Sequence, residues 1–261
     1  MAQVGSAADG AASSGKTSSE GHSTLAVGRS GGKAAETWER SFYFLMSLLV
    51  MVVVAYGFGR KLDEKLIHAA SPRPTILYIH ALLFAAWVMF FTVQSALVRT
   101  RKVKVHKMLG WFGLALGSAI PVVGIATALV MIRMELRQGL TFVAPFFIIA
   151  AQDMISFGVT FGLAFWWRTK PEFHRRLMFV ATCALTSAAF TRIPWVPGRW
   201  FYAGVDCLIL FGVVRDLITM KRIHPVYLWG LPLMMLGQMA TMYVMVTKWP
   251  PWMKVVNAIF G

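Results

Sequence analysis

Long apolar stretches recur along this chain, and they constrain its fold more than any other feature. The first reads SFYFLMSLLVMVVVAYGF over residues 41–58. Wound as an α-helix, a stretch of this length crosses a hydrocarbon layer about 30 Å thick. Its residues are continuously apolar, whereas the strands of a membrane β-barrel are shorter and alternate between apolar and polar. We therefore predict an all-α protein, a polytopic bundle of transmembrane helices.

Seven such spans are expected within one transmembrane domain over residues 37–261. They cover residues 41–58, 75–97, 108–131, 142–167, 175–193, 199–219 and 226–247. Only 14% of all residues are Asp, Glu, Lys or Arg, against about 25% in soluble domains. Residues 1–36 differ, because Ala, Ser and Gly supply 22 of these 36 positions. This composition is typical of a disordered tail.

The net charge of +15 raises the question of a nucleic-acid partner, but the basic residues lie mainly in short loops between the apolar stretches. Loops on one side of the expected membrane, together with the tail to Arg40, hold 16 Lys and Arg, and the opposite loops hold 10. The cytoplasmic side carries the larger number. We therefore expect a lipid bilayer rather than nucleic acid as the partner. The tail then lies in the cytoplasm and the C-terminus outside.

Few ionisable residues lie within the spans, and each needs a physical reason because a charge near the bilayer centre costs about 2.5–3.5 kcal/mol. The expected topology places four such residues in the outer half of the bundle, namely His80, Asp153, Arg192 and Asp206. Gln94 joins them because it follows His80 by two heptads on one helix face. The group predicts a buried site for a proton, an ion or a small ligand. The alternative is an ion pair of Arg192 with Asp153 or Asp206 that only ties helices together.

Three histidines stand just before the third, fifth and seventh spans, at the opposite face of the expected membrane. They are His106, His174 and His224, and Asp216 ends the sixth span nearby. Imidazole is a common ligand of transition metals and haem iron. Three histidines with a carboxylate could hold a metal, and two at equal depth could clamp haem b. The alternative is that each histidine only bonds a carbonyl, a headgroup or the end of its helix.

Several segments resemble an uncharacterised family of bacterial multi-helix integral membrane proteins, over most of residues 40–247. The resemblance rests on these segments: IHALLFAAWVMFFTVQSALV with His80 and Gln94, VHKMLGW with His106, AAQDMISF with Asp153, PEFHRRLMFVAT with His174, TRIP with Arg192, and VRDLITMKRIHPVYLWG with Asp216 and His224. It implies a multi-helix membrane fold in a bacterial inner membrane. It implies no activity.

A looser similarity links the chain to four-helix b-type cytochromes, in which histidines on membrane helices bind haem. Those proteins pair histidines near both membrane faces for two haems. Here His80 is the only histidine within a span near the outer face, so the pattern departs from theirs and does not support a second haem.

Three functions follow from these residues as hypotheses. The first is a haem or metal redox protein using the histidines, the second a proton-linked or small-solute transporter using the buried polar group, and the third a structural or assembly protein. The chain contains no phosphate loop and no Ser/His/Asp or Cys/His arrangement that would indicate an enzyme class.

Overall fold

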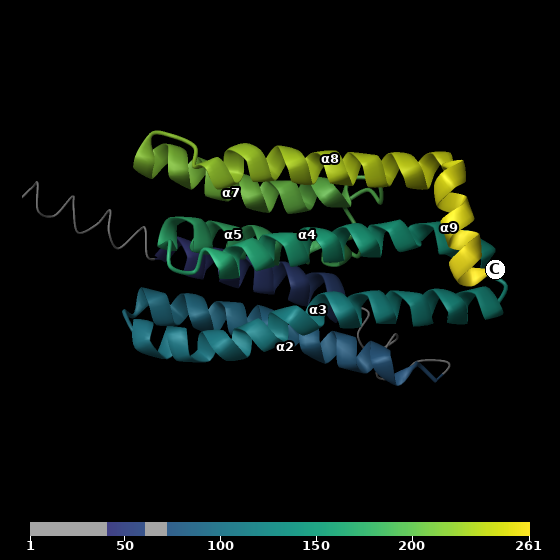
Figure 1. Cartoon of the computed structure of the whole chain (residues 1–261), viewed down its shortest axis with the longest axis horizontal. Helices are drawn as coiled ribbons and strands as arrows, with labels where there is room; N and C mark the ends of the chain where they lie inside the picture. Colours follow the sequence, from purple (N-terminus) through teal and green to yellow (C-terminus); the bar gives the residue numbers. More distant parts are fainter. Residues whose placement is uncertain (1–40, 61–71) are drawn as a thin grey trace, which may run out of the picture. The chain divides into compact units, whose positions relative to one another are not determined.

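The computed structural model describes residues 41–60 and 72–261, and the expected tail over residues 1–36 lies outside these ranges. Within the two ranges the regular secondary structure is helical, and no strand occurs there (Figure 1). The prediction of an all-α protein is therefore confirmed. The described helices are Ser41–Gly59, which carries no label, and then α2 (Thr75–Arg99), α3 (Val103–Arg137), the 3-10 helix η2 (Thr141–Phe146), α4 (Phe147–Trp166), α5 (Pro171–Ala184), α6 (Ser187–Phe190), α7 (Phe201–Met220), α8 (Pro225–Thr247) and α9 (Pro250–Phe260).

Five helical segments among the described residues are long and apolar enough to cross a membrane. They are Ser41–Gly59, α2, α3, Phe142–Trp166 and α8. The other two expected spans correspond to α5 with α6 and to α7. The helix α5 has only 14 residues, and the 20-residue α7 holds three charged side chains.

Two helices differ from the expected spans at their ends. α3 has 35 residues, so it is about 52 Å long at 1.5 Å per residue and exceeds a hydrocarbon layer of about 30 Å. The C-terminal segment forms α9, which the span prediction left as a loop. In Figure 1, α9 runs crosswise to α8. It packs on the start of α4, where Trp252 stacks on Phe147 with ring centroids 6.2 Å apart, and Val256 is buried.

The fifth expected span is not one continuous helix. α5 ends at Ala184, and the four-residue α6 starts at Ser187. At this break the Thr186 hydroxyl donates to the carbonyl oxygen of Cys183 over 2.6 Å. A Ser or Thr hydroxyl that bonds a carbonyl of the preceding turn competes with the helical hydrogen bonds and often bends the helix. The break lies beside the site described below.

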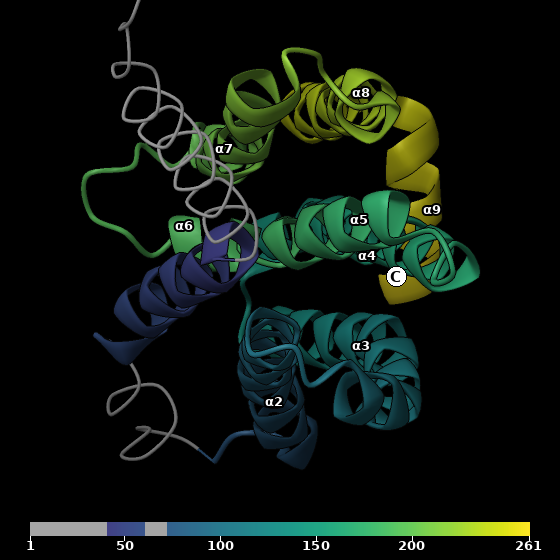
Figure 2. The same cartoon turned by 90° about the vertical axis from the view of Figure 1, so that its left-hand side faces the viewer.

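The helix α4 lies at the centre of the bundle, in contact with α3, α5 and α8. Seen end-on in Figure 2, α2 and α3 lie on one side of the α4–α5 pair, and α7 and α8 lie on the other. Small residues allow close packing, as the motif Gly113-x-x-x-Gly117 predicts. A methyl group at Gly113 would overlap the Phe90 ring, and one at Gly117 would overlap the Phe161 ring.

Candidate functional site

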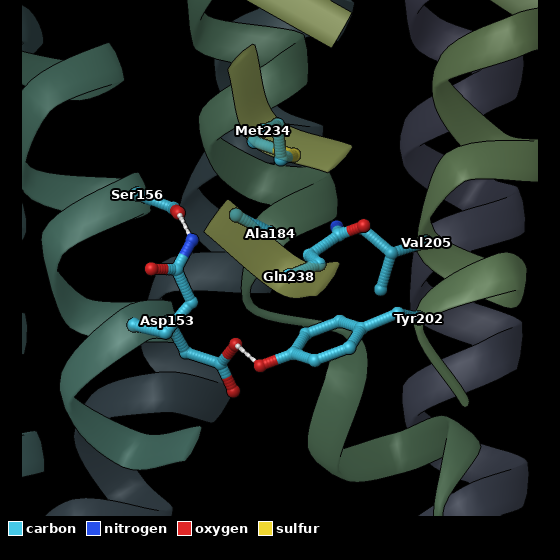
Figure 3. Close-up of a pocket in the computed structure, with 8 residues that line it drawn as sticks. Asp153, Ser156, Ala184, Tyr202, Val205, Met234 and Gln238 are labelled. Atoms are coloured by element: carbon cyan, nitrogen blue, oxygen red, sulfur yellow. Dashed lines mark hydrogen bonds between the residues drawn. The ribbon is translucent and has the colours of Figure 1, made fainter. Parts of the chain in front are cut away.

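The carboxylate of Asp153 on α4 joins three helices inside the bundle. The Tyr202 hydroxyl, in the first turn of α7, donates to its Oδ1 over 3.2 Å (Figure 3). The hydroxyl of Ser187, the first residue of α6, donates to its Oδ2. The helix break between α5 and α6 therefore delivers a hydroxyl group directly to this carboxylate. Broken helices in membrane transporters hold ions and protons at such breaks.

A second carboxylate lies one helical turn further along α7. Asp206 follows Tyr202 by four residues, which places both side chains on the same side of the helix. Gln238 of α8 donates from Nε2 to Asp206 Oδ1 over 3.1 Å. We call the set of Asp153, Ser187, Tyr202, Asp206 and Gln238 the Asp153 site.

A small cavity opens beside Asp153, between α4, α5, α7 and α8 (Figure 3). The centre of a water molecule can occupy a volume of about 10 Å³ in this cavity. This is room for about one water molecule, whereas pockets for drug-sized ligands measure about 300–1,000 Å³. Its polar wall comes from Gln152, Asp153, Ser156, Tyr202 and Gln238. The cavity therefore suits a water or a proton and excludes an organic solute.

No cation pairs with either carboxylate of the Asp153 site within the described ranges, where the ion pairs involve other acidic residues. Arg192, the partner that the sequence offered, instead lies over the Phe58 ring with its guanidinium carbon 4.5 Å from the ring centroid. It follows the short α6, and its side chain turns toward the helix Ser41–Gly59. The alternative of an Arg192 ion pair with Asp153 or Asp206 is therefore wrong for this structure.

His80 and Gln94 do not line the cavity either. The His80 ring packs against Phe84 with centroids 4.1 Å apart. Gln94 donates from Nε2 to the His106 carbonyl over 3.4 Å. Fourteen residues of helix separate His80 from Gln94 by about 21 Å. Their heptad spacing gives them a common face of α2 but different depths in the membrane.

The three interfacial histidines lie at one end of the bundle, called here the histidine end. The rings of His106 and His174 have centroids 6.2 Å apart and an interplanar angle of 76°. His174 Nδ1 lies 2.8 Å from the carbonyl oxygen of Ala164. The His224 ring contacts Phe173 instead, with centroids 4.7 Å apart. Two of the three histidines therefore form a pair, and the third has a separate environment.

Asp216 belongs to an ion-pair network rather than to a metal site. Arg176 of α5 donates to both Asp216 oxygens, from Nε over 2.8 Å and from Nη2 over 2.7 Å. Arg215 Nη1 donates to Oδ1 over 2.8 Å. All three side chains are buried. Among residues 41–60 and 72–261, no group of three or more His, Cys, Asp and Glu is placed to hold a metal. The hypothesis of a three-histidine metal site with Asp216 is therefore wrong here, because two arginines already neutralise Asp216.

Glu172 and His224 lie at the histidine end, outside the expected spans, and both have shifted pKa values. Burial by itself would raise the pKa of Glu172, but its hydrogen bond to Arg176 and the charges of Arg175 and Arg176 hold that pKa below its usual value. Burial, followed by the positive charge of Arg176, lowers the pKa of His224 from its usual 6.5. Neutral His224 caps α8, because its Nδ1 accepts a hydrogen bond from the Val226 N–H over 3.2 Å.

Comparisons with protein-family models, with curated proteins and with solved structures find no match for this chain. The interpretation of the site therefore rests on its geometry.

Several residues of the site do not stand out in the sequence. Tyr202, Ser187 and Gln238 are polar residues in apolar stretches, and each alone is common in membrane helices. A weak signal exists in the i, i+4 spacing of Tyr202 with Asp206 and of Gln152 with Ser156. Arg176 and Arg215 also gave no signal, because both are adjacent to the ends of expected spans, where basic residues are usual.

Proposed function

We propose that this protein is a proton-linked membrane transporter in which Asp153 binds and releases the proton. One observation carries the proposal. Asp153 is a carboxylate inside an apolar bundle, held by Tyr202 and Ser187 at a helix break, and it pairs with no cation in the described residues. Ionisable groups within membrane helices mark ion and proton pathways by default.

The surroundings of Asp153 favour a proton over a larger cargo. An ionised carboxylate without a cation is costly in a medium of low dielectric constant, and it lowers that cost by taking up a proton. The adjacent cavity has room for about one water molecule. A carboxyl group, the Tyr202 hydroxyl and one water are sufficient to pass a proton. The site of any co-transported solute would lie elsewhere.

The proposal includes a complete seven-span topology. The pair α5–α6 and the helix α7 supply the two spans beyond the five apolar ones. The charges of α7 support this assignment because each has a partner inside the bundle. Asp206 bonds Gln238, while Asp216 and Arg215 belong to the network with Arg176. No charged side chain of α7 then needs to face lipid.

We further propose that the histidine end faces the cytoplasm and that the C-terminus lies outside. The larger number of Lys and Arg in the loops of the histidine end supports this orientation. We also propose that the protein belongs to the bacterial family that its sequence resembles and that it lies in the inner membrane.

Infrared titration of the purified protein in liposomes tests the proton site. We expect the carbonyl band of a protonated carboxyl group, and Asp153→Asn should remove this band. The matched control is Thr127→Val on α3, which removes a buried hydroxyl that bonds only the carbonyl of Val123 in its own helix. This control should leave the band unchanged.

Proton flux into the same liposomes tests transport. A potassium gradient with valinomycin supplies the driving potential, and an enclosed dye reports internal pH. We expect flux with the unchanged protein and with Thr127→Val, and the rate of empty liposomes with Asp153→Asn. If Asp153→Asn only lowers thermal stability and leaves band and flux unchanged, the third hypothesis, a structural role, replaces this proposal.

A second candidate, haem-dependent electron transfer, is favoured by the pair His106 and His174. The contact of His174 Nδ1 with a carbonyl oxygen leaves Nε2 available, as in histidines that ligate metals. Ligation of haem b by both imidazoles would leave no open iron position, which suits electron transfer. A Soret band that His174→Ala removes would support this candidate. Protein that carries no Soret band after expression with added haem would contradict it.

A further inference from the structure

Polar residues form two groups along the facing sides of α7 and α8. On α7, Tyr202, Asp206 and Asp216 lie within about 80° of one another, because successive residues turn by about 100°. On α8, Tyr227 and Gln238 are eleven residues apart and return to nearly the same side. The α7–α8 contact therefore carries the Asp153 site at one end and a second polar group at the histidine end.

The second group contains the buried hydroxyl of Tyr227, and the buried hydroxyl of Tyr43, from the helix Ser41–Gly59, lies beside it. The two hydroxyls are within reach of each other, and neither bonds any other described group. Tyr227 is only 2% exposed. Its hydroxyl points at the α7 backbone, where a methyl group at Gly212 would overlap it. One hydrogen bond between the two hydroxyls still leaves one O–H without an acceptor. A buried polar group left unpaired costs about 1–3 kcal/mol, so this place suits a bound water.

The charged neighbours of these tyrosines favour proton transfer through the hydroxyls over uptake of a proton by Asp216. Arg176 of α5 and Arg215 of α7 compensate the negative charge of Asp216. The Asp216 carboxylate therefore stays ionised. A tyrosine hydroxyl, in contrast, can accept a proton from one side and give up its own proton to the other. Such a step leaves the tyrosine unchanged, and charge and protons balance.

An apolar layer separates the two polar groups. Tyr227 and Gln238 are about 16 Å apart along α8 at 1.5 Å per residue. The residues between them at this contact are buried and apolar, namely Ile209, Leu231 and Met234. A proton can cross this layer only when water enters it transiently. A transporter needs such a barrier, because a continuous water path would dissipate the gradient.

We propose that Tyr43 and Tyr227, with bound water, form the relay through which Asp153 exchanges its proton with the histidine end of the bundle. This inference rests on the proposed function, in which Asp153 is the proton-binding group. It adds the route to one side of the membrane, the residues of the relay and the apolar layer that controls it.

The test compares Tyr227→Phe with Tyr243→Phe on the same helix. Both variants remove one hydroxyl and keep the ring, but Tyr243 is 62% exposed on the outside of the bundle. Liposomes are sorted by protein orientation, and proton flux is started by a pH jump on either side. We expect Tyr227→Phe to slow flux from either side by about tenfold or more, because every proton that crosses must pass the relay, while Tyr243→Phe matches the unchanged protein. Tyr43→Phe provides a second variant if Tyr227→Phe fails to fold.

The outcomes separate the two proposals. Flux that depends on Asp153 but is equally fast in Tyr43→Phe and Tyr227→Phe overturns the relay and leaves the proposed function in place. Flux that does not depend on Asp153 overturns both. A shift of the infrared carboxyl band of Asp153 in Tyr227→Phe also contradicts the relay, because the tyrosine would then act on the Asp153 site itself and not on the route to it.

Discussion

Arg176 and Asp216 form a bidentate ion pair in which neither side chain is exposed to solvent. The pair joins α5 to α7, and Arg215 adds a third hydrogen bond to the same carboxylate. Removing one partner leaves a buried charge without compensation, whereas removing both avoids that cost. The pair therefore connects the two expected spans that are not among the five long apolar helices.

A double-mutant cycle measures this pair. Asp216→Asn and Arg176→Met should each lower the free energy of unfolding by about 3–5 kcal/mol. The double variant should lose clearly less than the sum of the two. Arg175→Met is the control, because Arg175 pairs with the half-exposed Glu172, and such pairs contribute about 0–1 kcal/mol. Thermal unfolding in detergent provides the comparison, and additive losses would contradict a direct interaction.

The bond between Tyr202 and Asp153 predicts a specific spectroscopic change. Tyr202→Phe removes the hydroxyl that donates to Asp153 Oδ1 and should lower stability by about 1 kcal/mol. It should also shift the infrared carboxyl band of Asp153, because the carboxyl group loses a hydrogen bond. Tyr243→Phe, exposed on α8, should change neither quantity. An unshifted band in Tyr202→Phe would show that the two groups do not interact.

The lowered pKa of His224 predicts that the folded protein loses stability in mild acid. Its pKa in the folded protein is lower than the usual 6.5, because of burial and then of the charge of Arg176. As pH falls below 6.5, the unfolded chain binds a proton before the folded one does, so unfolding becomes more favourable. Protonation also removes the acceptor at Nδ1 that caps α8.

Two variants of this histidine separate the cap from the titration. His224→Asn keeps a capping acceptor that does not titrate, and its stability should depend less on pH between about 7.5 and 5.5. His224→Ala should lose about 1 kcal/mol at neutral pH through the missing cap. Melting temperatures measured over this pH range separate the contribution of the helix cap from that of the titration. An Asn variant with an unchanged pH profile would assign the titration to another group.

The helix Ser41–Gly59 approaches α6 closely at Gly57, and we expect this contact to tolerate no larger side chain there. A methyl group at Gly57 would lie 2.6 Å from the backbone oxygen of Ala189, and backbone atoms cannot yield as side chains do. Gly57→Ala should therefore cost about 1–3 kcal/mol. Gly59→Ala is the matched control, since its methyl group meets nothing within 4 Å. Equal melting temperatures for the two variants would place the helices further apart.

The amino-acid sequence by itself determined that this is an all-helical protein with several membrane-length helices. Apolar length is a property of each segment alone, and a segment such as residues 41–58 needs no knowledge of its neighbours to be recognised. The sequence also marked Asp153 and Asp206, because an acidic residue in an apolar stretch is conspicuous wherever the helix packs.

Only the tertiary structure decided which side chains meet. Heptad spacing placed Gln94 on the face of His80 but could not separate their depths. Arg192 and Arg176 lie at opposite ends of the fifth expected span, yet of the two only Arg176 reaches a carboxylate. Ser187 became a partner of Asp153 because the helix breaks before it. Such contacts depend on the rotation, depth and breaks of packed helices, which the pattern of one segment does not contain.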